Sequence, residues 1–241
     1  MRAEPNLLPI DSRRLGSMLI LAADTSGKQG SIALAHGLNN GKSDVIEVVP
    51  LTGGTFSAQL VPQVAALLSK HDFKKQDIDA FAVASGPGSF TGLRVGLAAI
   101  KGLAEILEKP IATVSMLEAV ATAGGMQGRV FAVLDAGRRE VYAGRYQVAA
   151  DRARMIDERL ITLEALATSV DGLTLMTPEK SIAETLAAKG ISVVEVPVQQ
   201  SDAIASLGWK KILAGETVSP EALEANYIRR TDAEIFSKSR S

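Results

Sequence analysis

The sequence predicts an α/β protein made of two similar halves, each organised around a mixed β-sheet. Three observations lead to this fold class. Apolar runs, turn residues and helical periodicities follow the same order twice: strand, aspartate-containing turn, strand, strand, helix, strand, helix. The chain has 241 residues, which is enough for two modest units with a core in each. Its 46% hydrophobic and 22% charged residues are typical of a globular protein.

The first half begins with the apolar run 18–25, which lacks the alternation of a strand with one wet face and therefore predicts a central strand. Further strands are expected at residues 31–35, 45–51, 78–84 and 111–114. Helices are expected at 58–70 after a Ser57 cap, at 92–108 before Pro110, and after a Ser115 cap through 123. Pro62 is compatible only with the first turn of its helix.

The second half repeats this order from residue 129. Strands are expected at 129–135, 140–148, 155–161, 173–176 and 193–196. A short helix is expected to begin at 162–164, a second to run over 178–189, and a third to run through 214 after a cap at Ser201 or Asp202. From Ser219 onward the chain is expected to be mostly irregular.

These elements predict two stacked α/β lobes with mixed sheets and duplicated βββαβα units, joined between residues 110 and 125. The actin, sugar-kinase and heat-shock ATPase (ASKHA) architecture is built in this way. We expect a flexible N-terminal extension at 1–17, an N-terminal lobe at 18–115, a C-terminal lobe at 116–215 and a C-terminal tail at 216–241.

Composition narrows the function. The chain has no cysteine, which excludes thiol catalysis and zinc–thiolate sites. Its formal net charge is −1, whereas a protein that grips a nucleic-acid backbone unaided usually carries a basic excess. No apolar run reaches membrane-spanning length and no signal peptide is evident, so the expected location is cytoplasmic. A basic cluster near the C-terminus could touch RNA phosphates weakly within a larger assembly: Arg229, Arg230, Lys238 and Arg240.

A glycine-rich loop joins an apolar strand to a helix within residues 81–96. Free backbone N–H groups and the helix dipole suit such a junction to an anion, but a tight structural turn fits the same residues. The loop is not a Walker P-loop, because Leu93 and Arg94 follow Gly92, and Ser89 lacks the flanking glycines of a nucleophile elbow. Its glycines are expected to be structural, and at least one is expected to have positive φ: Gly86, Gly88 and Gly92.

Asp24 and Asp135 end the first strand of the two halves. In an ATP-using protein of this architecture, carboxylates there would hold Mg²⁺-bound water. The alternative, favoured by the bulky Arg138 and Arg139 after the second aspartate, is that each side chain accepts a turn hydrogen bond from the backbone. If a nucleotide or phosphate binds, its contacts are expected among Asp24, Thr25, Ser26, Gly86, Gly88, Ser89, Thr91 and Asp135. His36 and His71 lie far apart in sequence without a carboxylate cluster, so no metal site is expected.

Four stretches carry a resemblance to a known family. The run Gly86-Pro87-Gly88-Ser89-Phe90-Thr91-Gly92-Leu93-Arg94 resembles the signature of the TsaB (YeaZ) family of bacterial tRNA threonylcarbamoyladenosine biosynthesis proteins. The opening strand 18–26, the hairpin 133–142 and the segment 227–234 are similar to other parts of that family, in its order and spacing.

The resemblance implies a non-catalytic dimerisation and activating subunit of the complex that transfers a threonylcarbamoyl group to N6 of adenosine 37 in tRNA. It also implies the ASKHA fold, a catalytic partner of the TsaD type, a small ATPase of the TsaE type and a homodimer when the chain is alone. No cofactor and no membrane are implied, and tRNA is contacted only through the complex. The related catalytic subunit carries an H-x-x-x-H metal pair, whereas the equivalent residues 55–62 contain no histidine and Phe56 stands where many relatives carry one.

A different function remains open from the sequence: an ATP-dependent small-molecule kinase of the same architecture. Its site would comprise Asp24, Asp135 and the loop 86–92. Binding of Mg-ATP that fails in Asp24→Ala and Asp135→Ala would favour it.

The helix predicted at 92–108 has more apolar surface than one sheet contact requires. Its polar side chains fall in one stripe about 60° wide, and apolar or small residues fill an arc of roughly 200°. One edge of this arc, either at Leu97 or at Ile106, is expected to face a partner helix together with part of the helix 58–70. The expected interface residues are Leu60, Val64, Val95, Leu97, Ala99, Leu103 and Ile106.

Overall fold

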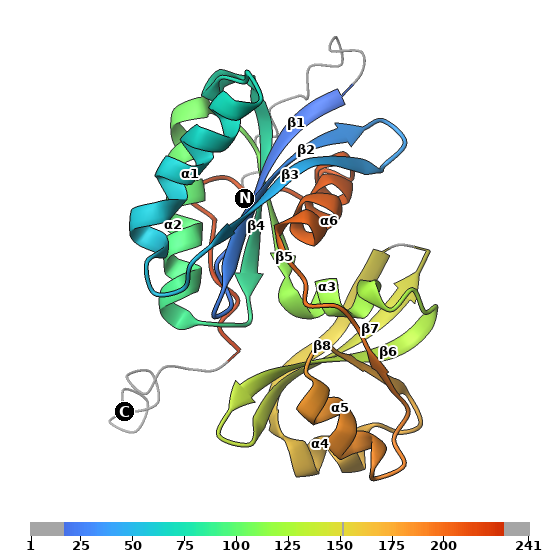
Figure 1. Cartoon of the computed structure of the whole chain (residues 1–241). Helices are drawn as coiled ribbons and strands as arrows, with labels where there is room; N and C mark the ends of the chain where they lie inside the picture. The colour runs from blue at the N-terminus through green and yellow to red at the C-terminus, as the bar shows by residue number, and fades with distance from the viewer. Residues whose placement is uncertain (1–16, 151, 229–241) are drawn as a thin grey trace, which may run out of the picture. The chain divides into compact units, whose positions relative to one another are not determined.

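A computed structural model describes residues 17–150 and 152–228, which divide into two compact units (Figure 1). Among the described residues, the first unit contains 17–85, 89–114 and 200–224, and the second contains 86–88, 115–199 and 225–228. The predicted N-terminal extension lies outside the described residues except for Ser17, and so do the four basic residues near the C-terminus.

The first unit is a five-stranded mixed sheet with the order β3-β2-β1-β4-β5. Its strands are β1 (Ser17–Asp24), β2 (Gly30–Leu38), β3 (Ser43–Leu51), β4 (Ile78–Gly86) and β5 (Ile111–Ser115). β1 pairs antiparallel with β2 and parallel with β4, so it is the central strand that its continuous apolar run predicts. Its residues 20–23 are fully buried, because helices cover both faces of the sheet.

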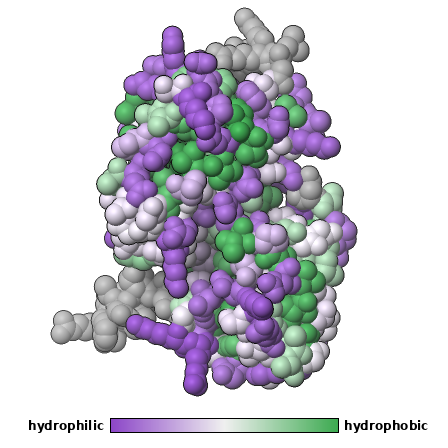
Figure 2. Space-filling model, viewed as in Figure 1, coloured by the Kyte–Doolittle hydropathy of each residue, from purple (hydrophilic) through white to green (hydrophobic). Residues whose placement is uncertain are grey.

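Two helices, α1 (Phe56–Lys70) and α2 (Phe90–Leu107), lie side by side on one face of this sheet, and α6 (Ser201–Leu213) covers the other (Figure 1). A short 3₁₀ turn, η1 (Lys75–Asp77), precedes β4. α6 packs closely: a Cβ at Gly208 would lie 2.4 Å from the Ala82 Cβ, and the Trp209 indole N–H donates to the Leu38 carbonyl oxygen at 2.9 Å. On the face that Figure 2 shows, hydrophobic residues gather where the edge strand β3 is only half-buried.

The second unit has a five-stranded sheet with the order β10-β9-β6-β7-β8. Its strands are β6 (Gly128–Gly137), β7 (Glu140–Ala149), β8 (Arg152–Thr162), β9 (Thr174–Thr177) and β10 (Val193–Glu195). One face carries a core with α4 (Leu163–Ser169) and α5 (Lys180–Ala187), and α3 (Met116–Ala123) packs on the other. Ser115 caps α3 and Thr162 caps α4, each accepting a hydrogen bond from a helix N–H, as the sequence predicts.

Both sheets follow one scheme, with the third, second, first, fourth and fifth strands of each repeat in that spatial order. This repeated scheme confirms the predicted α/β fold of two mixed sheets with duplicated units. The helix after the fifth strand of each repeat packs on the sheet built by the other repeat, and so belongs to that sheet's unit: α3 packs on β6–β8 in the second unit, and α6 packs on β1–β3 in the first. The predicted C-terminal lobe 116–215 is therefore corrected, because residues 200–224 belong to the first unit. Periodicity marks α6 as amphipathic but does not say which sheet its apolar face covers.

Two helix details differ from the prediction. α1 begins at Phe56 after Thr55, not after a Ser57 cap, which places Pro62 in the second turn of the helix. Pro62 and the preceding turn residue Ala58, whose carbonyl oxygen it leaves without an intrahelical donor, are both exposed, so water can satisfy that oxygen. α2 begins two residues early because the Ser89 hydroxyl accepts the Gly92 N–H at 3.2 Å. No helix in the described ranges is long and apolar enough to cross a membrane.

Candidate functional site

The glycine loop before α2 is bonded to the turn that follows β1. The Ser89 N–H donates to the Ser26 carbonyl oxygen at 2.7 Å, and the Thr25 hydroxyl donates to the Gly92 carbonyl oxygen at 2.7 Å. Thr25 is buried, so the second bond is shielded from water. These two bonds join the end of the central strand to the first turn of α2, and the second of them spans 67 residues of sequence.

Glycines are needed where α2 approaches this turn. A Cβ at Gly92 would lie 2.1 Å from the Thr25 carbonyl oxygen, and one at Gly96 would lie 2.3 Å from the Thr25 hydroxyl oxygen. At the start of the loop, Gly86 has a φ of 114°, a conformation that favours glycine. This confirms the predicted positive φ within the loop. Two of its amides, those of Ser89 and Gly92, already donate within the protein, which supports the structural interpretation over a phosphate cradle.

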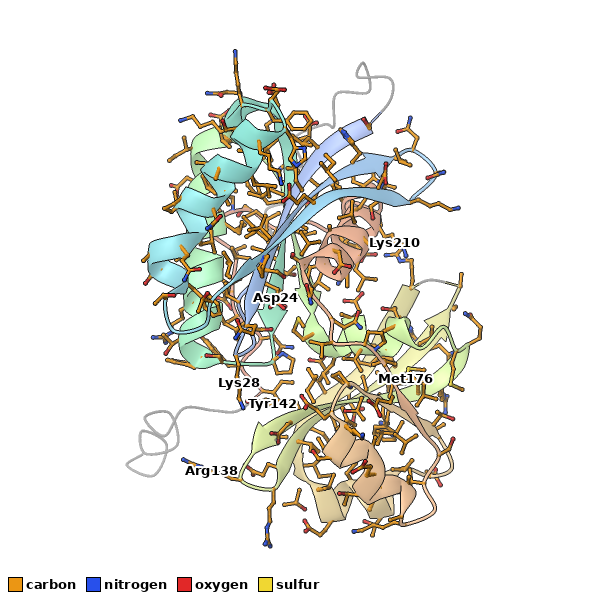
Figure 3. The ribbon with its side chains drawn as sticks, in the orientation of Figure 1. Asp24, Lys28, Arg138, Tyr142, Met176 and Lys210 are labelled. Atoms are coloured by element: carbon orange, nitrogen blue, oxygen red, sulfur yellow. The ribbon has the colours of Figure 1, made fainter. Side chains whose placement is uncertain are left out.

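The aspartates at the ends of β1 and β6 make equivalent bonds in different surroundings. Asp24 Oδ1 accepts the Ser26 N–H at 2.8 Å, and Asp135 Oδ1 accepts the Gly137 N–H at 2.9 Å, so each closes the turn predicted for it. Asp24 is buried, and desolvation raises its pKa against the opposing effect of the Ser26 hydrogen bonds. Asp135 is exposed beside the hairpin tip, from which Arg138 projects outward (Figure 3).

The two histidines, His36 and His71, contact side chains of their own unit and not a group of metal ligands. His71 Nε2 lies 2.7 Å from Glu47 on β3, and Lys70 Nζ lies 2.7 Å from the same carboxylate. Hydrogen bonds from Lys70 and then His71 lower the pKa of Glu47. The His36 ring makes an edge contact with Phe73, with 6.1 Å between ring centroids. Across the described residues, no three His, Asp or Glu side chains form a group that could hold a metal ion.

The predicted interface residues divide into buried and exposed sets. Leu60, Val64 and Leu97 are buried beneath the helix pair, and Ile106 is 74% exposed. The exposed edge of α2 is therefore the Ile106 edge, a choice that the sequence left open. The remaining members, Val95, Ala99 and Leu103, are half-buried.

A groove of about 480 Å³ lies along α1 and α2. Its lining includes three residues that were not among the predicted interface residues: Val61, which the sequence places on the apolar face of its helix and which is 53% exposed, Phe90 and Ala98. The Arg94 guanidinium lies 3.8 Å from the Phe90 ring centroid and so holds this ring at one end of the groove. Phe90 could have been found from the sequence as a large apolar residue one turn before Arg94, which belongs to the polar stripe of the helix. The groove is apolar and shallow, which suits a packed helix better than a polar small molecule.

Comparison with known proteins defines first the class and then the family. A family model described as TsaD, tRNA N6-adenosine threonylcarbamoyltransferase, matches residues 48–225. A solved structure of YeaZ from Pseudomonas aeruginosa superposes with a TM-score of 0.71 at 26% identity, covering 87% of this chain and 99% of that one. The chain therefore has the α/β fold of the YeaZ structure and is similar in sequence to the TsaD transferase family.

Comparison with curated proteins identifies the family more narrowly. The chain is 38% identical over 131 residues to the tRNA threonylcarbamoyladenosine biosynthesis protein TsaB of Bacillus subtilis, covering 54% of this chain and 56% of the relative. It is 36% identical over 134 residues to TsaB of Escherichia coli, covering 54% and 55%. The chain spans about half the length of the curated relatives it matches. The chain belongs to the TsaB (YeaZ) family.

Proposed function

We propose that this chain is a non-catalytic subunit that binds and activates a TsaD-type transferase, which modifies adenosine 37 of tRNA with a threonylcarbamoyl group. Family membership supports the pathway, because curated relatives are named as tRNA threonylcarbamoyladenosine biosynthesis proteins. A TsaE-type ATPase is the further partner that the family implies. In this proposal, tRNA meets the chain only within the assembled complex.

The groove along α1 and α2 is the observation that carries the proposal. Helix pairs on a sheet normally bury their apolar residues, yet here Val61 and Ile106 remain more than half exposed on the outer side of α1 and α2. A helix from a second protein laid in the groove would cover Val61 and the Phe90 ring, and it would reach Ile106 by continuing along α2 beyond the groove lining. The proposed occupant is the transferase in the complex, or a second copy of this chain when the transferase is absent.

The non-catalytic role is supported by the chemistry of the side chains near the loop. Residues 55–62 form the start of α1 without a histidine, and Phe56 is buried in the core. Asp24 is engaged in its turn and its pKa is raised by burial, which disfavours the ionised form that a cation requires. The proposed activity of the chain is therefore to shape its partner and not to perform the transfer.

The test is reconstitution of the transfer reaction from the TsaD-type transferase of the same organism, with and without this chain. We expect little transfer from either protein alone and robust transfer from both together. Ile106→Glu should weaken binding at least tenfold while the circular dichroism spectrum stays unchanged, because the charge lies on an exposed edge. Val198→Glu is the matched control, since Val198 is 70% exposed and lies outside both helices.

Robust transfer by this chain alone would refute the non-catalytic role. A wild type that stays monomeric at high concentration and does not bind the transferase would refute the role of the groove. Equal loss of binding in Ile106→Glu and Val198→Glu would also count against it.

A further inference from the structure

The sheet of the second unit carries a cluster of arginines on the face that α4 and α5 only partly cover. Side chains on one face follow from the strand pairings: Arg129 of β6 aligns with Gln147 of β7, which aligns with Arg154 of β8. In the next row Phe131 aligns with Arg145 and Asp157. The alternation along β8 places Arg152 and Arg159 on this face as well. The arginine face is defined as Arg129, Arg145, Arg152, Arg154 and Arg159.

This face is positively charged although the protein is not. Its five arginines are accompanied by one acidic residue of the same rows, Asp157, which leaves a formal excess of four positive charges in a chain of net charge −1. Asp157 is bound by Arg145 through two hydrogen bonds, at 2.7 and 2.9 Å. Arg129 and Arg154 are exposed, and Arg159 has a buried Nε without an acceptor among the described residues.

Protection of an edge strand does not account for the cluster. Charged residues on an edge strand such as β8 commonly prevent pairing with other sheets. Arg129 and Arg145, however, lie on the inner strands β6 and β7. Like charges placed in neighbouring rows of one sheet face repel and cost stability, and an external anion would offset this cost. All the basic residues of the three strands are arginines, and none is a lysine. The guanidinium group of arginine can bind two phosphate oxygens at once in a bidentate geometry.

We propose that the arginine face binds the phosphate backbone of RNA, specifically the tRNA that the complex modifies. This inference rests on the proposed function for the identity of the RNA. The face extends about 10 Å across three strands and roughly 20 Å along β8, which is long enough for several consecutive phosphates. Phosphate contacts of this kind position a nucleic acid without reading its sequence, as expected for a subunit that serves many tRNAs.

The experiment measures binding of an unmodified tRNA transcript to the complete complex over a series of KCl concentrations. The test variant is Arg129→Glu/Arg154→Glu, and Arg129→Gln/Arg154→Gln removes the charge without reversing it. The matched control, Lys180→Glu/Lys189→Glu, makes the same change in net charge on exposed positions of the same unit. Circular dichroism establishes that all variants are folded.

We expect the Glu variant to bind tRNA at least about tenfold more weakly at near-physiological salt, and the Gln variant to lie between it and the wild type. The slope of log K against log[salt] should become shallower by about one to two, because each phosphate contact contributes close to one. The lysine control should keep the wild-type slope. Equal slopes for the wild type and the Glu variant would overturn the inference.

Failure of the inference and of the proposed function can be told apart. If the chain supports transfer but the arginine variants bind tRNA normally, the inference fails and the proposed function stands. If the chain does not support transfer but the arginine variants lose affinity for tRNA, the proposed function fails and the inference stands. If the variants keep tRNA affinity and instead lose the transferase, the face binds an acidic protein surface, which also overturns the inference.

Discussion

The two units share one strand order and differ in how their sheets are covered. In the first unit, α1 and α2 have 15 and 18 residues; their counterparts in the second, α4 and α5, have 7 and 8. The long pair covers its sheet and presents apolar side chains outward, whereas the short pair leaves part of its sheet face to arginines. One topology thus yields an apolar surface on one unit and a basic surface on the other, because helix length decides what remains exposed.

The turn after the first strand shows the same contrast at a smaller scale. Asp24 and Asp135 make equivalent turn bonds, but only Asp24 is buried, in a turn that also receives the first residues of α2. The first turn is part of the core of its unit, and the second is a surface hairpin. Substitutions at corresponding or neighbouring sites should therefore have unequal effects.

The largest effect is expected at Gly92. In Gly92→Val, the new Cβ would meet the Thr25 carbonyl oxygen at 2.1 Å, and a backbone atom cannot move aside without separating α2 from β1. We expect a loss of about 3–5 kcal/mol in the free energy of unfolding, measured by urea denaturation. Gly102, in the same helix, has nothing within 4 Å of its Cβ position, so Gly102→Ala should stabilise by about 0.5–1 kcal/mol. Similar effects at both sites would contradict the close approach of α2.

A polar cluster in the second unit gives the next largest effect. The Glu158 carboxylate accepts hydrogen bonds from Tyr146, from the α3 cap Ser115 and from Asn226. Burial is the main cause that raises the pKa of Tyr146, and the negative charge of Glu158 raises it further. The hydroxyl therefore stays protonated and donates a hydrogen bond. Glu158→Leu leaves this buried hydroxyl with a weaker partner and should cost about 2–3 kcal/mol. Tyr146→Phe removes one donor and should cost about 1 kcal/mol in thermal unfolding. A larger cost for Tyr146→Phe than for Glu158→Leu would mean that the hydroxyl, and not the carboxylate, is the main stabilising member of the cluster.

The two aspartates provide a third comparison. Because burial raises the pKa of folded Asp24, its contribution favours folding at acidic pH and is lost as the pH rises through the folded pKa. Asp24→Asn keeps the acceptor for Ser26 and removes the charge, so it should stabilise by on the order of 1 kcal/mol at pH 7 and have no such benefit at pH 4. Asp135→Asn, at an exposed turn, should change stability by less than about 0.5 kcal/mol at either pH. Chemical denaturation at both pH values measures the difference.

The smallest effect is expected at the Arg145–Asp157 pair, where both side chains are partly exposed. The hydrogen bonds from Arg145 lower the pKa of Asp157, so the pair stabilises above the unfolded pKa and loses its effect as the pH falls through the folded one. Arg145→Ala should lower the free energy of unfolding only slightly at pH 7, because solvent screens the pair, and the cost should vanish in acid. This dependence on pH is opposite in sign to that of Asp24. A cost independent of pH would mean that Arg145 acts through packing.

Local features of the fold were predictable from the sequence. Most strands and helices begin and end within two or three residues of the predicted positions, because apolar periodicity, caps and turn residues act over a few neighbouring positions. The turn bonds of Asp24 and Asp135 are local for the same reason. The loop 86–94 also identified the family, since its order of residues is specific even where its physical role was ambiguous.

Only the tertiary structure decided which distant residues meet. It assigned α6 to the first sheet, placed Ile106 outward and Leu97 inward on α2, and brought Thr25 to Gly92. The arginine face depends on the pairing of β6, β7 and β8, where a register shift between Arg145 and Tyr146 sets which β8 side chains share a face. The spacing of apolar residues along the sequence determines whether each segment forms a helix or a strand. Which elements pack together depends instead on contacts between segments that are tens of residues apart. The free energy of such a contact cannot be predicted from either segment alone.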